Sequence, residues 1–238
     1  MSLSTGELEE GELTVVGQLA DASNGSLLCT LDGLGGDPGP FVIYKPRAGE
    51  RPLWDFPTGT LSLREVAAFV VADSLGWPIV PPTVWRDGPF GPGMVQEWVE
   101  VDTEADLVEL VQSDRGDLRR IAVFDAVINN GDRKGGHLLP TPNGDVWGID
   151  HGVTFAVEDK LRTVLWQWRG HPLPEQLLQD LERWHGKWSD TDGPAERLSR
   201  YLSDEEVETL DARVRALLRT RRHPQPSPDW PAIPWPPF

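Results

Sequence analysis

The pattern of apolar residues changes near Asp102, and this change constrains the fold more than any other feature of the chain. Before it, short apolar segments such as PFVIYKP and GMVQEWVEV alternate with Gly-, Asp- and Pro-rich separators, which is typical of β-strands joined by turns. One early segment, 61–77, has helical spacing instead, and helical spacing dominates after Asp102. We therefore predict an α+β fold of two lobes, with one main helix in the strand-rich N-lobe and a helical C-lobe.

Composition delimits these lobes and a tail. We expect the N-lobe at residues 1–101, the C-lobe at 102–223 and a tail rich in Pro and Trp at 224–238. The tail cannot form a regular helix or sheet and should run as polyproline II. Its aromatic side chains, Trp230, Trp235 and Phe238, gain free energy from burial, so we expect the tail to dock on the body.

The charge and cysteine content exclude several classes of protein. A formal net charge of −16 argues against nucleic acid or an anionic membrane as the main partner, because both require a positive field. A single cysteine, Cys29, excludes an intramolecular disulfide and a cysteine-based metal cluster. Because neither a signal-peptide pattern nor an apolar run of about 20 residues is visible, we expect a cytoplasmic protein with no membrane partner.

The segment INNGDRKGGHLL, residues 128–139, is too rich in ionisable groups for a simple surface turn. Eighteen residues after Asp132 comes Asp150, and the Asn143–Gly144 turn between them predicts a hairpin. The hairpin should fold the two carboxylates toward each other. Phosphoryl transfer needs such a pair, because one carboxylate orients the attacking hydroxyl while the other holds Mg²⁺ on the nucleotide phosphates.

Other residues are suited to hold a nucleotide. Lys45 lies in an apolar strand, where an unpaired ammonium group is costly, and Glu65 on the main helix is its natural partner. Ser62 and Glu65 also form a capping-box pattern, as do Ser203 and Glu206, so a capping role for Glu65 stays open. A turn near residue 24 can cover phosphates, and the lobe junction can offer backbone groups to adenine. The nucleotide-binding candidates are Ser23, Asn24, Gly25, Ser26, Lys45, Glu65, Glu97, Trp98 and Val99.

The order of these motifs, ending in GDRKGGH and GIDHG, resembles the phosphatidylinositol 3-/4-kinase superfamily, whose catalytic loop reads Asp-Arg-x-x-x-Asn. The resemblance runs from about Val15 to Phe155 and is closest to small actinobacterial members. It implies a bilobal ATP-dependent kinase. Lys45 would be the phosphate-binding lysine, Asp132 the catalytic aspartate and Asp150 the metal-binding aspartate.

The chain departs from this family at His137, where the catalytic loop should carry a metal-binding Asn. Hard cations prefer oxygen ligands, so an imidazole here suits Mn²⁺ better than Mg²⁺. His137 is thus either a second metal ligand beside Asp150 or a hydrogen-bonding residue of the loop.

The sequence therefore favours a kinase-like phosphotransferase that uses ATP with Mg²⁺ or Mn²⁺. The acidic composition argues against a phosphoinositide acceptor, so a protein hydroxyl or a small polar molecule is expected. Two alternatives remain: a nucleotide-binding pseudokinase that acts through a protein partner, and a kinase-fold enzyme that transfers AMP.

Overall fold

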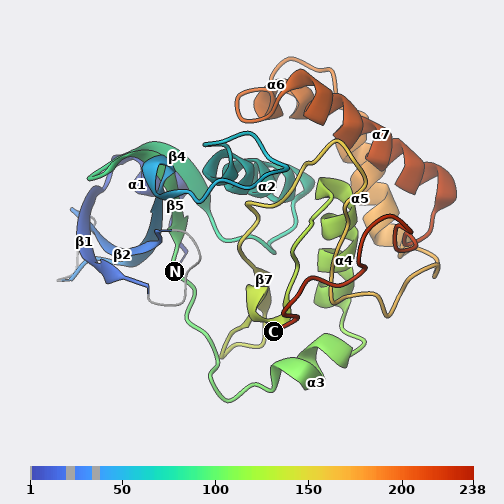
Figure 1. The fold of residues 1–238 in the computed structure, drawn as a ribbon, viewed down its shortest axis with the longest axis horizontal. Helices are drawn as coiled ribbons and strands as arrows, with labels where there is room; N and C mark the ends of the chain where they lie inside the picture. The colour runs from blue at the N-terminus through green and yellow to red at the C-terminus, as the bar shows by residue number, and fades with distance from the viewer. Residues whose placement is uncertain (1, 20–24, 34–37) are drawn as a thin grey trace.

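An antiparallel sheet of five strands forms the N-terminal part of the molecule (Figure 1). The computed structural model describes residues 2–19, 25–33 and 38–238. The strand order is β1-β2-β3-β5-β4, so β5 lies between β3 and β4. This pairing sets Lys45 opposite Met94 and Val42 opposite Glu97, which brings the strand that carries Lys45 beside the lobe junction. The strands are β1 (Glu12–Gln18), β2 (Leu27–Asp32), β3 (Phe41–Pro46), β4 (Thr83–Gly88) and β5 (Gly91–Glu97).

Helices dominate the rest of the chain, as the periodicity predicts. Helix α7 packs against α4 and α5, and one hydrophobic core joins these helices to α2 (Leu61–Leu75) of the N-terminal part. A two-stranded hairpin with a turn at Asn143–Gly144 lies between α4 and α5, also as expected. The elements are α3 (Leu107–Gln112), α4 (Gly116–Ile128), β6 (Leu138–Pro140), β7 (Val146–Gly148), α5 (Glu175–His185), α6 (Pro194–Leu198) and α7 (Asp204–Thr220).

Helix α2 (Leu61–Leu75) is buried on nearly all sides, because it packs against β4 and β5 and also against α5 and α6. The capping box expected at its start is wrong. The carboxylate of Glu50 instead accepts hydrogen bonds from the amides of Leu61 (3.1 Å) and Ser62 (2.8 Å). Glu65 is thereby free to face the sheet. The second capping box is confirmed, since Ser203 and Glu206 cap α7 reciprocally.

A buried arginine ties α2 to the C-terminal helices. Arg64 donates to the carbonyl of Thr154 (2.8 Å) and pairs with Glu206 at the start of α7. Its guanidinium also lies over the ring of Phe56, 4.7 Å from the centroid. Because α2 carries Glu65, these contacts fix the position of that carboxylate relative to the C-terminal part.

Among the described residues, two α-helices and one strand were not expected from the sequence: α1 (Thr5–Glu10), α6 and β4. Helices α1 and α6 are too short to show a clear apolar period. Strand β4 runs into the Gly- and Pro-rich segment 86–93, which reads as a separator but forms the tight end of the β4–β5 hairpin. The lobe boundary near residue 101 stays a prediction.

Among the described residues, no helix is both long enough and apolar enough to cross a membrane.

The tail after His223 lies on the body. Trp230 stacks on Trp54 with ring centroids 6.4 Å apart, and the carbonyl of Ala232 accepts hydrogen bonds from Thr163 and Trp166. The expected burial of its aromatics is only partly correct. Trp235 is 85% exposed and Phe238 51% exposed. The backbone carbonyls, as well as the rings, therefore hold the tail in place.

Candidate active site

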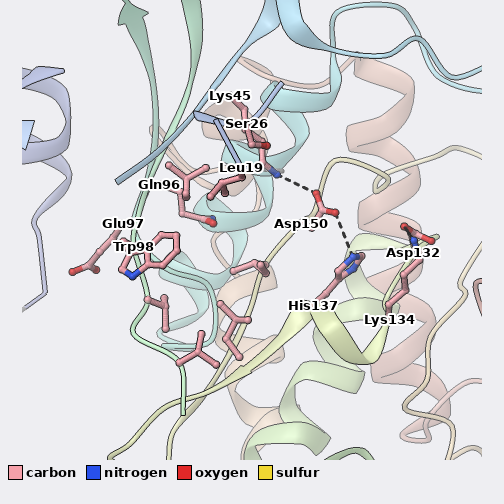
Figure 2. A pocket seen from close by; sticks show the side chains of 15 residues that line it. Leu19, Ser26, Lys45, Gln96, Glu97, Trp98, Asp132, Lys134, His137 and Asp150 are labelled. Carbon is pink, nitrogen blue, oxygen red and sulfur yellow. Dashed lines mark hydrogen bonds and ion pairs between the residues drawn. The ribbon is translucent and has the colours of Figure 1, made fainter. Parts of the chain in front are cut away.

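Lys45 is the centre of a charged cluster between the sheet and the C-terminal part. Side chains alternate along β3, so Lys45 and Ile43 face the cavity while Tyr44 is buried on the other side. The Lys45 Nζ atom lies 2.6 Å from Glu65 Oε1 and 3.1 Å from Asp150 Oδ1 (Figure 2). The structure thus brings together three residues that the sequence assigned to one site.

The pKa shifts in this cluster favour the ionised forms of Lys45 and Asp150. Burial lowers the pKa of Lys45, but the carboxylates of Asp150 and Glu65 offset this and raise it above its ordinary value. The ammonium of Lys45 holds the pKa of Asp150 well below its usual range, against the effect of burial. Burial raises the pKa of Glu65, opposed by Lys45. Asp150 therefore stays ionised and available to a cation.

Asp132 lies at the edge of the same cavity, in the loop after α4. Its amide donates to the side chain of Asn130 (2.9 Å), and its carboxylate pairs with Lys134 Nζ at 3.0 Å. Both side chains are about a quarter exposed, so an incoming molecule can reach them. Lys134 belongs to the segment 128–139 that is rich in ionisable groups, but no role was predicted for it.

Arg133 connects this loop to the hairpin and was missed as a functional residue. It is fully buried and forms a salt bridge with Asp125 of α4 (2.9 Å). Its guanidinium also donates to the carbonyls of Ile149 (2.9 Å) and His137 (3.3 Å). Because Asp132 precedes Arg133 and Asp150 follows Ile149, Arg133 sets the two aspartates relative to each other. Its signal in the sequence is its place directly after Asp132, at the Arg of the Asp-Arg-x-x-x-Asn pattern.

His137 approaches Asp150 from the loop that follows α4. Its Nε2 atom lies 3.4 Å from Asp150 Oδ2, while its Nδ1 atom is buried without a hydrogen-bond partner among the described residues (Figure 2). Burial lowers the pKa of His137, although Asp150 acts in the opposite direction, so the imidazole is neutral near pH 7. The structure therefore places both candidate metal ligands side by side.

A cation here would have few protein donors. Among the described residues, no group of three or more His, Cys, Asp and Glu side chains is arranged to hold a metal ion. Asp150 fits a hard cation, because it offers an ionised oxygen ligand. Phosphate oxygens and water would have to complete the coordination, as is usual for Mg²⁺ on a nucleotide.

The cavity has a volume of about 430 Å³ and combines this charged end with an apolar one. Ser26, Glu97, Trp98 and Val99 line it as expected, but Gly25 does not, and its amide bonds to the carbonyl of Gly49. Ser23 and Asn24 lie outside the described residues. The remaining lining residues are Leu19, Ile43, Lys45, Gln96, Val101, Asp132, Lys134, His137, Leu139, Ile149 and Asp150.

The lobe junction differs from expectation in detail. The carboxylate of Glu97 points away from the cavity and accepts hydrogen bonds from Ser2 and Leu3 (Figure 2). The amides of Glu97 and Trp98 already bond to the carbonyls of Pro82 and Phe41. Sequence reasoning also missed Gln96, whose buried side chain donates to Thr83 (2.8 Å) at the back of the cavity.

Solved structures with a protein-kinase-like fold match most of the chain. The Golgi casein kinase with Mn/ADP bound has a TM-score of 0.61 at 15% identity, covering 91% of this chain and 74% of that one. Hydra Fam20 with sugar has a TM-score of 0.59 at 15% identity, covering 91% and 86%. The Helicobacter pylori proinflammatory kinase CtkA has a TM-score of 0.52 at 12% identity, covering 90% and 94%. The protein thus has a protein-kinase-like fold, which confirms the predicted α+β fold of two lobes.

The sequence also has a relative that is similar over nearly its whole length. Protein Rv2133c of Mycobacterium tuberculosis (strain ATCC 25618 / H37Rv) is 43% identical, over 97% of this chain and 94% of that protein. This chain belongs to the same family as Rv2133c. No protein-family model matches the sequence.

Proposed function

We propose that the protein is an ATP-dependent phosphotransferase of the phosphatidylinositol 3-/4-kinase-like type. The observation that carries this proposal is Lys45, whose ammonium bridges Glu65 and Asp150 at the charged end of a cavity bordered by the lobe junction. A kinase requires a lysine paired with a helix glutamate and an adjacent metal-binding aspartate. The Golgi casein kinase that shares the fold was crystallised with Mn/ADP, which supports a nucleotide and a divalent metal as ligands.

The cavity suggests how ATP binds. Adenine would lie in the apolar end, with Leu19 and Ile43 from the sheet on one side and Leu139 and Ile149 from the hairpin on the other. Because the amides of Glu97 and Trp98 are already bonded, the junction would recognise adenine through Val99 or through carbonyl groups. The phosphates would then point toward Lys45, which can pair with their oxygens.

The acceptor would enter beside Asp132. This carboxylate can accept the proton of a hydroxyl group on the acceptor while the oxygen of that hydroxyl attacks the γ-phosphorus. The bond from that phosphorus to the β-γ bridging oxygen then breaks, and ADP leaves. Lys134, 3.0 Å from Asp132, can stabilise charge on the transferred group. We propose a protein hydroxyl or a small polar molecule as the acceptor.

A divalent cation, Mg²⁺ or Mn²⁺, would be held by Asp150 and the phosphates, with His137 beside it. When bound, it would neutralise negative charge on the phosphates. Lys45, together with Asp150 through the cation, would hold the phosphates in place, so that the γ-phosphorus faces the acceptor hydroxyl beside Asp132.

Thermal unfolding with ATP and each metal tests the proposal. Ligand at a hundred times its dissociation constant stabilises by about 2.7 kcal/mol, so a rise in melting temperature is expected. Asp150→Asn should abolish the metal-dependent part of the shift, and Asp132→Asn should keep the shift but lose ATP turnover. No shift with millimolar ATP and either metal would refute nucleotide binding.

His137, at the position of the family's metal-binding Asn, favours a second candidate function, a nucleotide-binding pseudokinase. Nucleotide binding without ADP release in the presence of cell extract as acceptor would support it. Mass spectrometry of modified acceptors separates phosphate transfer, which adds a phosphoryl group, from AMP transfer.

A further inference from the structure

The last residues of the chain end on the catalytic loop. From Trp230, beside Trp54, the tail passes Thr163, where the carbonyl of Ala232 accepts a hydrogen bond of 3.1 Å. The carbonyl of Pro237 then accepts a hydrogen bond of 2.8 Å from the amide of Gly135. Figure 1 shows the carboxyl terminus beside the β6–β7 hairpin. A segment more than a hundred residues away in sequence thus contacts the loop between Asp132 and His137.

Phe238 makes the closest part of this contact. Its ring lies against the backbone of Gly135, which is buried, so that a side-chain carbon at Gly135 would overlap the ring. Apart from its chain neighbours, no atom of the described residues lies within 4 Å of where a Cβ atom at the neighbouring Gly136 would be. The close approach of Phe238 therefore explains a glycine at 135 but not the one at 136.

The segment that Phe238 contacts is the glycine turn of the proposed catalytic loop, whose far end is held where the His137 carbonyl accepts hydrogen bonds from Arg133 and from the amide of Ile149. Arg133 is anchored by the buried salt bridge to Asp125, whereas residues 135–137 form a single short turn. Because the turn contains two adjacent glycines, fixing it in one conformation costs more backbone entropy than it would for other residues. Lys134 and His137, which flank the two glycines, both line the cavity, so the conformation of the turn sets their positions.

We infer that Phe238 is a positioning residue. With the carbonyl of Pro237, it holds the glycine turn and through it the side chains of Lys134 and His137. The effect on turnover rests on the proposed phosphotransferase function, but the contact itself does not.

Hydrogen exchange of the full-length protein tests the contact independently of activity. Phe238→Ala removes the ring and should speed amide exchange in residues 134–138 by roughly tenfold, since local opening then breaks fewer interactions. Core amides of α4 should be unaffected. Phe238→Tyr keeps the ring of a residue that is 51% exposed, and should restore wild-type exchange. Trp235→Ala is the matched control, because Trp235 is an aromatic residue of the same tail that is 85% exposed.

Gly135→Ala offers a second test that leaves the tail unchanged. The added methyl group displaces the ring, so exchange in 134–138 should rise as in Phe238→Ala, and the double variant should exchange no faster than either single one. Equal exchange in wild type and Phe238→Ala would overturn the inference.

Turnover provides the functional part of the test. Phe238→Ala should lower kcat for ATP by about tenfold, because a catalytic loop displaced by about 1 Å loses much of its rate. KM for ATP should change little, and Phe238→Tyr should restore kcat. A rise in kcat would overturn the inference, since it would mean that the tail blocks the acceptor. A wild type without turnover would refute the proposed function and leave the exchange result standing.

Discussion

The salt bridge between Arg133 and Asp125 should make a large contribution to stability, and its loss can be predicted from the structure. Both side chains are completely buried, and Asp125 accepts from Arg133 Nη2 at 2.9 Å and from its Nε at 3.1 Å. Asp125 also accepts from Asn130 at 2.9 Å. Asp125→Ala leaves the guanidinium buried without its counter-ion, so the perturbation is that of an uncompensated charge.

Breaking a buried pair in this way costs about 3–5 kcal/mol. A protein of this size unfolds with a free energy of about 5–15 kcal/mol, so the variant should lose a large share of it. The melting temperature should fall by roughly 6–20 °C, at about 2–4 °C per kcal/mol for chains of this length.

Urea unfolding, followed by Trp fluorescence, measures this cost. The matched control is Arg200→Ala, which removes an Arg–Asp pair of similar length, 3.2 Å to Asp192, in which both partners are more than half exposed. Exposed pairs contribute at most about 1 kcal/mol, so the control should change little. If Asp125→Ala cost no more stability than Arg200→Ala, the buried pair would not stabilise the loop that carries Asp132.

Three further predictions concern single residues. Burial, with a smaller contribution from Arg119, lowers the pKa of His223 to about 4. Because the unfolded chain then binds a proton at higher pH than the folded one, stability should fall as pH drops from about 6.5 toward 4. His223→Gln should make the melting temperature less dependent on pH in this range. Glu65→Gln should lower ADP release in steady-state assays by at least about tenfold, because Lys45 loses the partner that fixes it. His137→Asn should leave the Mn²⁺/Mg²⁺ activity ratio unchanged, and a marked shift toward Mg²⁺ would identify His137 as a metal ligand.

The parts of the site that could be predicted from the sequence are those with a local signature. Lys45 stands out because a charge in an apolar strand requires a partner, and the Asn143–Gly144 turn fixes the hairpin that brings Asp132 and Asp150 together. Strand and helix periodicities likewise gave most elements. These signals act over a few residues, where spacing alone determines which side chains share a face.

The parts that escaped prediction depend on contacts between distant segments. Glu50, 11 residues before Leu61, caps α2, so that the carboxylate of Glu65 can pair with Lys45 instead. Neither the capping box pattern nor the periodicity can reveal that choice, because it depends on how the loop after β3 folds back. Similarly, no local pattern links Phe238 to Gly135.

The prediction for His137 follows from its two ring nitrogens. A histidine that ligates a metal through one nitrogen almost always donates its other N–H to a partner, which fixes the tautomer. In His137 the Nε2 atom faces Asp150, while Nδ1 is buried with no partner among the described residues. Metal binding through Nε2 would put the proton on this unpartnered nitrogen, and a buried N–H without an acceptor is costly. The opposite tautomer points Nε2–H toward Asp150 Oδ2, 3.4 Å away, where its positive end attracts the carboxylate and helps to orient it. His137 is therefore better suited to orient Asp150, the proposed metal ligand, than to bind a metal itself.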